Sequence, residues 1–540
     1  MVRELRAFSF CLLLVGLAER SLALSRHGGI LDHQQDRRLL GATASDLAHP
    51  GYATVFRRLK ASEADVLQLI NTLAGTAVLL GQPQYGRARN LTQNINMMYN
   101  TAQPLLIVYA ASEGDVAAAV RFAAQRRLPL CPRAGGHDSA GACICEGGIV
   151  VDVSGMTQIN LFPERGEAQL EAGVRFRDLT AALAPHDLAA LQGDCADVGI
   201  TGYTLGGGWG KLTKSHGLGV DNVLAYRVVL ADGSTVVANE TGPYSDLFWI
   251  FRQAEVLTWN ATWDAAASPR RAARVLKAWQ DHFLNKEPRQ LSLYPHFQAD
   301  RTARTQLLVM YAIYTEVGPG AEAELRRLLH PLRALRPLDT ATARIPTANL
   351  SDLMDALEDP IMGSAPPGGA MASPEMWELK LGMFVERRLS LKEMRAIVDG
   401  WLTWPAFPAN YSGPAWTYAY FEPVEGAAAD VAPDAMAYVH REVGWDLVVD
   451  TFFLSSPPGM LRRAQRWLGG LHGKRWAPLL SGRAYQNYPS FSRLYSPRGR
   501  ALQRYYGSNL CRLVQLKAKY DPAEVFSSAQ GVPPRLSGCA

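Results

Sequence analysis

Apolar residues in the first half of the chain alternate between the spacing of short strands and the spacing of helices from about Thr76 onward. Ser112 and Asp115 form a capping-box pattern, and helical spacing follows at Val116 and Val120. An Asp-Gly pair separates two further apolar runs and predicts a hairpin. This half is predicted to be mixed α and β, with strands over residues 105–109, 128–131, 148–153, 169–174, 226–230 and 235–238 and a helix over 176–183.

The second half repeats longer strand-like runs with helical stretches between them. Several strands and long helices together predict an antiparallel sheet covered on one face by helices. The fold class is therefore α+β. The expected strands cover residues 291–298, 306–315, 376–386, 416–423 and 446–454, and the helices cover 321–335, 391–404 and 460–471.

The first 25 residues have the pattern of a secretory signal peptide. Arg3 and Arg6 precede an apolar run over residues 8–18, and small residues follow it. That run is shorter than the roughly 20 residues that span a bilayer, and no later segment is apolar enough to do so. We expect a soluble, secreted mature chain with no membrane partner. Five Asn-x-Ser/Thr sequons predict glycosylation at some of positions 90, 239, 260, 349 and 410.

Composition is typical of a large enzyme with two or three domains. The 540 residues include 19% charged residues, and the net charge of +5 is spread without long runs. Because no basic patch is interleaved with aromatic residues, nucleic acid is not an expected partner. Six cysteines remain after the signal peptide, which is too sparse for a disulfide scaffold. Cys143 and Cys145 have no matching His/Cys pair, so no metal site is expected.

The first of two glycine-rich segments covers residues 131–141. A short apolar strand leads into Arg133, followed by the adjacent glycines Gly135 and Gly136 and then His137. Paired glycines leave backbone N–H groups uncovered, and such a row of amides binds anions such as phosphate. The histidine would lie beside the bound group. An ordinary glycine turn with a surface histidine is the alternative interpretation.

The second segment covers residues 193–210 and contains seven glycines among eighteen positions. We expect it to form neither a helix nor a regular strand. A backbone this bare suits close approach to a large flat or phosphorylated ligand, and apolar residues such as Val198 and Trp209 argue against a flexible linker. No G-x-G-x-x-G opens any helix, so a nicotinamide-binding Rossmann fold is not expected.

Together the two segments resemble the FAD-binding domain of the berberine-bridge-enzyme-like oxidases, within the vanillyl-alcohol-oxidase or PCMH-type flavoproteins. The matching motifs are R-x-G-G-H, ending at His137, and G-x-C-x-x-V-G-x-x-G around Cys195. Residues 485–489, 505–507 and 519–526 also match the family. The resemblance implies FAD bonded through its 8α carbon to His137 and through C6 to Cys195. Further cofactor-binding residues would be Arg133, Ala134, Gly135, Gly136, Asp138, Ser139, Val198, Gly199, Gly202, Tyr203, Gly206, Gly207, Gly208 and Asn487.

The resemblance also implies a domain order. After an N-terminal extension over residues 26–75, a PCMH-type FAD-binding domain of two α/β subdomains would occupy 76–255. An antiparallel-sheet substrate domain would occupy 256–481. Residues 482–534 would return to the FAD domain, and 535–540 would form a tail. If Cys195 carries flavin, five thiols remain, and at least one of them must stay outside any disulfide.

The expected activity is that of a secreted, monomeric FAD-dependent oxidase. It would take hydride from a C–H beside a hydroxyl or amine of a carbohydrate, alcohol or alkaloid-like substrate and reduce dioxygen to hydrogen peroxide. Tyr485 is the candidate for proton abstraction. A dehydrogenase with another electron acceptor is an alternative. The family continues after the position of Arg252 with a glycine-rich turn and a flavin-contacting strand, which this chain lacks, so a non-catalytic flavoprotein relic is a third possibility.

Overall fold

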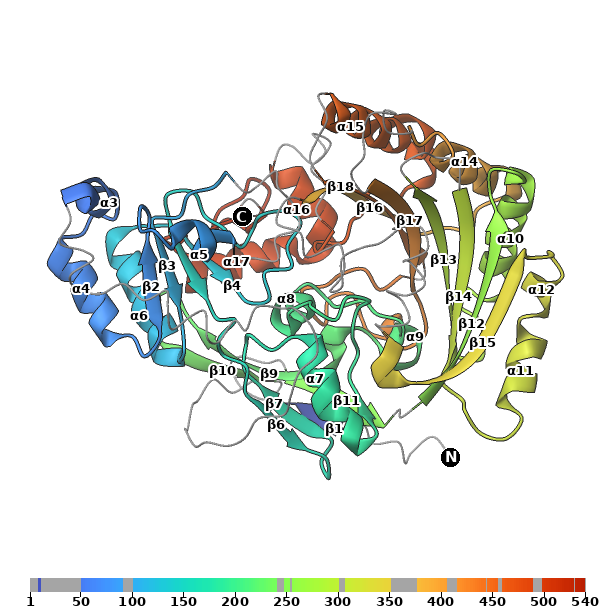
Figure 1. Ribbon diagram of the computed structural model, residues 1–540, viewed down its shortest axis with the longest axis horizontal. Coiled ribbons are helices and arrows are strands. Elements are labelled where there is room, and N and C mark those ends of the chain that lie inside the picture. Colours follow the sequence, from blue (N-terminus) through green and yellow to red (C-terminus); the bar gives the residue numbers. More distant parts are fainter. Residues whose placement is uncertain are drawn as a thin grey trace.

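The protein is described by a computed structural model. It describes residues 8–10, 50–90, 101–239, 247–252, 255–300, 306–350, 376–405, 415–442, 444–454, 459–488, 498–528 and 530–539. Two bodies lie side by side, with the segments of the first half on one side and a large sheet on the other (Figure 1). Among the described helices, none is both long and apolar enough to cross a membrane.

The first body begins with a four-stranded sheet in the order β2-β3-β5-β4. β3 and β4 both run parallel to β5, because helix α6 carries the chain back across the sheet between β3 and β4. Ser112 caps α6 by accepting a hydrogen bond from the Asp115 amide at 3.2 Å. The elements are α3 (Ala53–Arg58), α4 (Glu63–Thr72), β2 (Thr76–Leu79), α5 (Tyr85–Asn90), β3 (Leu106–Tyr109), α6 (Glu113–Arg126), β4 (Leu130–Arg133) and β5 (Ile149–Asp152).

A second sheet of the same body joins β10, β9 and β11, with β1 and β8 both paired to β11. β9 and β10 form the predicted hairpin, in which Val229 pairs with Thr235 and Gly233 has φ of +80°. β1 lies within the segment predicted as a signal peptide. The bounds are β1 (Phe8–Phe10), β6 (Ile159–Phe162), β7 (Glu167–Leu170), α7 (Phe176–Leu183), β8 (Leu188–Ala189), α8 (Ile200–Leu205), α9 (Thr213–His216), β9 (Val223–Val229), β10 (Thr235–Asn239) and β11 (Leu247–Arg252).

The second body is a seven-stranded sheet in the order β15-β12-β14-β13-β17-β18-β16, antiparallel at every pairing. The predicted antiparallel sheet is confirmed. Two of its strands, β12 and β15, were not predicted: β12 spans the expected domain boundary, and β15 is an almost fully exposed edge without an apolar pattern. The strands are β12 (Glu255–Asp264), β13 (Leu291–Asp300), β14 (Gln306–Tyr314), β15 (Asp339–Pro346), β16 (Met376–Val385), β17 (Ala415–Val424) and β18 (Gly444–Leu454).

Helices cover the outer face of this sheet (Figure 1). Leu293 and Phe297 of β13 pack in the core beneath them, next to Trp279 of α10 and Trp401 of α14. The predicted helix over 321–335 is divided in two near Pro331, which lies in the first turn of α12 and cannot donate a backbone hydrogen bond. The helices are α10 (Pro269–His282), α11 (Ala321–Leu328), α12 (His330–Arg333), α14 (Leu391–Trp401) and α15 (Met460–Gly470); α10 was not predicted.

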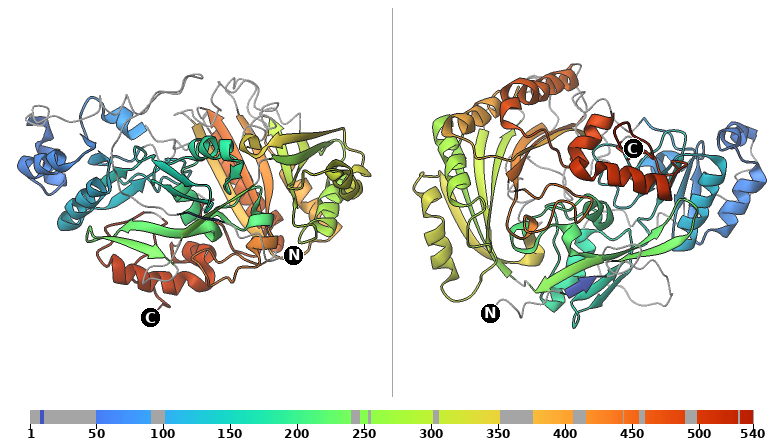
Figure 2. Two further views of the ribbon diagram at one scale, coloured as in Figure 1. Left: turned by 90° about the horizontal axis from the view of Figure 1, so that it is seen from below. Right: turned by 180° about the vertical axis from the view of Figure 1, so that it is seen from behind.

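The end of the chain returns to the first body. Helices α16 (Arg498–Tyr506) and α17 (Leu510–Tyr520) lie against the first-half segments in both views of Figure 2. The Leu130 amide donates to the Val525 carbonyl at 2.7 Å, and a disulfide joins Cys511 to Cys539. The C-terminal segment therefore passes from the large sheet back to β4, the strand that leads to His137.

Candidate active site

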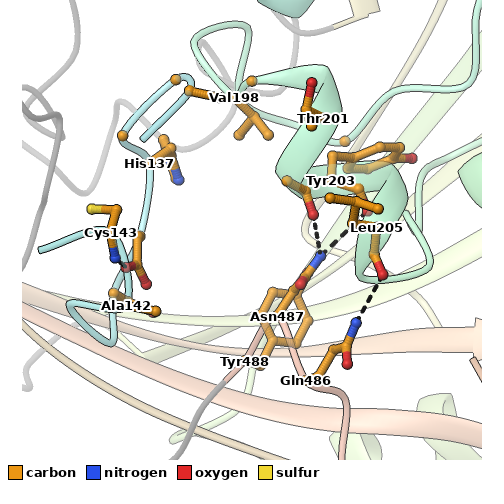
Figure 3. Close-up of a pocket in the computed structure, with 18 of the residues that line it drawn as sticks. His137, Ala142, Cys143, Val198, Thr201, Tyr203, Leu205, Gln486, Asn487 and Tyr488 are labelled. Carbon is orange, nitrogen blue, oxygen red and sulfur yellow. Dashed lines mark hydrogen bonds between the residues drawn. The ribbon is translucent and has the colours of Figure 1, made fainter. Parts of the chain in front are cut away.

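A cavity of about 980 Å³ lies between the two bodies. The parts of the chain that line it include the loop after β4, the glycine-rich segment around α8, the β9–β10 hairpin, the inner face of the large sheet, and the segment that follows residue 484. Figure 3 shows His137 and Val198 on one side and Asn487 and Tyr488 on the other. A cavity this size, lined mostly by apolar groups with a few polar ones, is typical of a cofactor or substrate site.

The loop after β4 is closed at its base by a disulfide between Cys131 and Cys145. Inside it, the Asp138 carboxylate accepts hydrogen bonds from the amides of Ala140 and Cys143, both at 2.9 Å. His137 is partly buried, and its side chain points into the cavity (Figure 3). Burial lowers the pKa of its imidazole, so the ring is held neutral and can act as a nucleophile.

The two glycine-rich segments touch each other. A Cβ on Gly135 would lie 2.6 Å from the Gly199 nitrogen, and one on Gly199 would lie 2.7 Å from the Gly135 nitrogen. These two glycines are therefore required for the loops to pack. Their contact brings His137 and Cys195, which are 58 positions apart, to the wall of the same cavity.

The second glycine-rich segment contains a helix, which corrects the prediction that it would form none. α8 covers only six residues, from Ile200 to Leu205. It ends where Gly207 and Gly208 take φ values of +116° and +79°, a region that favours glycine. The glycines thus shorten the helix without preventing it, and Gly202 inside α8 faces open space on the cavity wall.

Twelve of the predicted cofactor-binding residues line the cavity, as does Tyr485. They are Ala134, Gly135, Gly136, His137, Asp138, Ser139, Cys195, Val198, Gly199, Gly202, Tyr203 and Asn487.

Arg133 and the three consecutive glycines are not among the lining residues, which differs from the predicted direct contact. The Arg133 guanidinium forms a buried ion pair with Asp152 at 2.5 Å, which anchors the base of the His137 loop. Gly206 leaves room for the Asn487 side chain, and Gly207 leaves room for the Tyr438 ring. Gly208 does the same for Tyr203. Arg133 and the three glycines therefore pack against residues near the cavity without lining it themselves.

Tyr485 receives two hydrogen bonds at its phenolic oxygen. The Gly208 amide and the Asn487 side-chain amide each donate to it at 3.0 Å. Burial raises the pKa of Tyr485 well above its usual range, while the two donors favour the phenolate. Figure 3 shows the Asn487 side-chain amide also reaching the carbonyls of Gly202 and Tyr203 within α8, and Gln486 donating to the Leu205 carbonyl at 3.0 Å.

The inner face of the large sheet carries buried charges that the sequence interpretation missed. Lys380 lies directly across from Asp450, with an N–O distance of 2.8 Å, and is 3.0 Å from Glu378. Burial alone would lower the pKa of Lys380, but these two carboxylates raise it well above its ordinary value. In the sequence, these residues could have been recognised as charged residues at alternate positions of strands predicted to be apolar.

Glu422 is a second buried acid on this face. It accepts a hydrogen bond from the Tyr488 hydroxyl at 2.7 Å and lies across from Asp446 on the neighbouring strand. Burial, and then the nearby Asp446, raise the pKa of Glu422 well above its ordinary value. Burial also raises the pKa of Asp446, to about 7. Glu422 lines the cavity and adds a protonated carboxyl to it.

Of the five cysteines other than Cys195 that follow the predicted signal peptide, four form the two disulfides. Cys143 is the one that remains outside them, as the odd count predicted, and its thiol is buried. Cys195 also lies outside both disulfides, at the cavity wall. Within the described ranges, no cluster of three or more His, Cys, Asp or Glu side chains could hold a metal ion.

Comparison with known proteins matches two families to the chain. The FAD binding domain family covers residues 104–239, and the family described as berberine and berberine like covers residues 484–533. The FAD-linked oxidoreductase YgaK of Bacillus subtilis is 27% identical, over 86% of this chain and 97% of its own length. Chitooligosaccharide oxidase of Gibberella zeae is 25% identical, over 80% of this chain and 88% of its own length.

Solved structures show the same fold. The wild-type BBE-like 1 protein of Physcomitrella patens superposes with a TM-score of 0.69 at 21% identity, covering 87% of this chain and 99% of its own. The 6-hydroxy-D-nicotine oxidase of Arthrobacter nicotinovorans gives 0.70 at 22% identity, covering 86% and 98%. At these sequence identities the superpositions show a shared fold and nothing further.

The fold, the cavity and these matches define a flavoprotein oxidoreductase with a PCMH-type FAD-binding domain. Within that class the family models and the curated relatives confirm the resemblance of the chain to the berberine-bridge-enzyme-like FAD-linked oxidoreductases. Its cofactor is FAD.

Proposed function

We propose that the protein is a secreted oxidase whose FAD is bonded to both His137 and Cys195. One observation supports this most strongly: two loops far apart in sequence meet at Gly135 and Gly199 and present an imidazole and a thiol to one cavity. The residues fit the cofactor. A Cβ on Gly202 would meet no protein atom within 4 Å, so this part of the wall, in the same cavity as both nucleophiles, leaves open space.

The remaining lining residues would orient the cofactor and the substrate. Gly136, Asp138 and Ser139 of one loop and Val198 and Gly199 of the other would hold the FAD in this cavity. Bound FAD would accept a hydride from the substrate carbon, and dioxygen would then reoxidise it to give hydrogen peroxide. The inner face of the large sheet would hold the substrate against the cofactor and exclude water.

Tyr485 would accept the proton that leaves the substrate hydroxyl or amine. Because the Gly208 and Asn487 N–H groups both point at its oxygen, the phenolate is stabilised at the position where a proton must be received. Burial opposes ionisation, so activity should rise toward alkaline pH. Glu422 also borders the cavity, but its raised pKa favours the protonated carboxyl, which makes it the weaker candidate for receiving this proton.

Stopped-flow reduction of the flavin separates these two groups. Tyr485→Phe should slow flavin reduction about 10²- to 10⁴-fold, the usual contribution of a positioned acid or base. Glu422→Gln should leave most of the rate intact. Unchanged reduction in Tyr485→Phe, or the large loss in Glu422→Gln instead, would remove Tyr485 from this role. Peroxide formed per substrate oxidised then tests dioxygen as the acceptor, since a dehydrogenase would reduce a dye without peroxide.

Secretion is proposed from the N-terminal pattern, with glycosylation at sequons such as the exposed Asn349. N-terminal sequencing of protein from the medium should begin near residue 25. Protein found only inside the cell, starting at Met1, would refute secretion. We also propose that the enzyme acts as a monomer, which light scattering would test.

A further inference from the structure

His296 lies on the inner face of the large sheet and borders the cavity. It sits on β13, directly across from Val309 on β14 and Tyr420 on β17. Three tyrosine rings surround it, with centroid distances of 5.0 Å to Tyr418 and 5.9 Å to both Tyr311 and Tyr420. Only 5% of the residue is exposed.

The Nε2 atom of His296 is buried and has no hydrogen-bond partner among the described residues. A buried polar atom left without a partner destabilises the fold by about 1–3 kcal/mol. Two positions along the same face, Gln298 shows the usual arrangement, because its side chain donates to the Tyr311 hydroxyl at 3.1 Å. His296 therefore keeps an unused hydrogen-bonding group at the wall of the cavity.

The surroundings keep this imidazole uncharged. Burial, and then the nearby ammonium of Lys211, lower the pKa of His296 to about 3. Lys211 is itself paired with Asp194 at 2.9 Å and lies over the Tyr294 ring. In a neutral imidazole Nε2 either donates or accepts one hydrogen bond, depending on the tautomer, and a hydroxyl group can serve as the complementary partner in both cases.

We propose that His296 is a specificity-determining residue that hydrogen-bonds a hydroxyl group of the substrate. This rests on the proposed oxidase function and narrows its substrate to an uncharged, hydroxylated molecule. The flanking tyrosine rings supply flat apolar surfaces for the C–H faces of such a molecule. A cationic amine is disfavoured at this position because the Lys211 ammonium is close.

A stability measurement tests the first step without any ligand. His296→Phe replaces an unpartnered polar ring by an apolar one of similar shape, so the melting temperature of the substrate-free holoenzyme should rise by about 1–3 °C. Gln298→Met on the same strand and face is the matched control. It removes a hydrogen bond that is made, and its melting temperature should fall. A fall in His296→Phe as well would show a structural histidine and overturn the proposal.

A binding measurement tests the second step. D-glucose serves as the hydroxylated probe and benzylamine as the cationic one, each titrated into the holoenzyme and followed by the flavin spectrum. His296→Phe should weaken D-glucose binding at least about 10-fold, the loss of one hydrogen bond of about 1.4 kcal/mol. His296→Gln should restore part of it, and benzylamine binding should not change.

The hydroxyl assignment is contradicted if the wild-type protein does not bind D-glucose, if His296→Phe binds it equally well, or if His296→Phe loses benzylamine instead. Flavin content per chain is recorded for every variant. A yellow protein with unchanged flavin content that fails these tests loses only the role of His296. A colourless wild-type protein would remove the proposed function itself.

Discussion

Replacing Gly135 by alanine tests whether the contact between the two glycine-rich loops builds the site. The new Cβ would lie 2.6 Å from the Gly199 nitrogen and 2.8 Å from its Cα, whereas ordinary contact begins at 3.4 Å. The loops would have to separate by about 0.8 Å to accept it. Both partners are backbone atoms, so no side chain can rotate away.

The expected cost follows from overpacking. Forcing an extra methyl group into a packed contact costs about 1–3 kcal/mol. Alanine also has less conformational freedom than glycine in the unfolded chain, which stabilises the folded protein by about 0.4–1 kcal/mol. Gly135→Ala should therefore lower the free energy of unfolding by about 1.3 kcal/mol, the difference between the midpoints of these two ranges. Because the shift moves His137 relative to Cys195, flavin bonded at both residues should also fall.

The assay is urea unfolding of flavin-free protein from riboflavin-starved cells, together with flavin content of protein from supplied cells. Gly202→Ala is the matched control, since it also lines the cavity but meets no protein atom within 4 Å. It should leave flavin-free stability unchanged or raise it by up to about 1 kcal/mol, because alanine favours a helix. Full stability and full flavin content in Gly135→Ala would refute the loop contact.

Two further changes test the frame around the site. Arg133→Met leaves the buried Asp152 carboxylate unpaired and should lower the free energy of unfolding in urea by about 3–5 kcal/mol. Adding Asp152→Asn should recover part of this loss. A loss below about 1 kcal/mol would contradict the buried ion pair. Asp446 has a pKa raised to about 7, so its protonated form stabilises the fold at low pH and that contribution is lost as the pH rises through 7. The stability of Asp446→Asn relative to the wild-type protein should therefore increase from pH 4 to pH 8. If the difference between their melting temperatures stays constant across that range, the raised pKa of Asp446 is excluded.

The sequence predicted the parts of the fold that have strong local signals. Apolar runs bounded by turn residues located β13, β14 and β16–β18, and the Asp-Gly pair located the β9–β10 hairpin. β15 escaped because an exposed edge strand has no apolar face to read. α8 escaped because glycine content argues against a helix, while burial of Ile200 and Tyr203 in a shared core favours one.

The candidate site was predictable only in part, for a similar reason. His137 and Cys195 stand in glycine-rich motifs, so their chemistry could be recognised along the chain. The register of neighbouring strands is needed to recognise the buried polar residues of the sheet as part of the site, because it places Lys380, Glu422 and His296 on one face. Pairing between strands far apart in sequence is not encoded in any local pattern.

The covalent attachment of FAD is tested most directly on denatured wild-type protein. The protein is precipitated with acid, washed, digested, and its flavin-bearing peptides are identified by mass spectrometry. We predict a yellow pellet and one flavin that joins the peptides containing His137 and Cys195. His137→Ala and Cys195→Ala should each keep a single attachment, and the double variant should release the flavin. Recovery of all the flavin in the acid supernatant of the wild-type protein would contradict it.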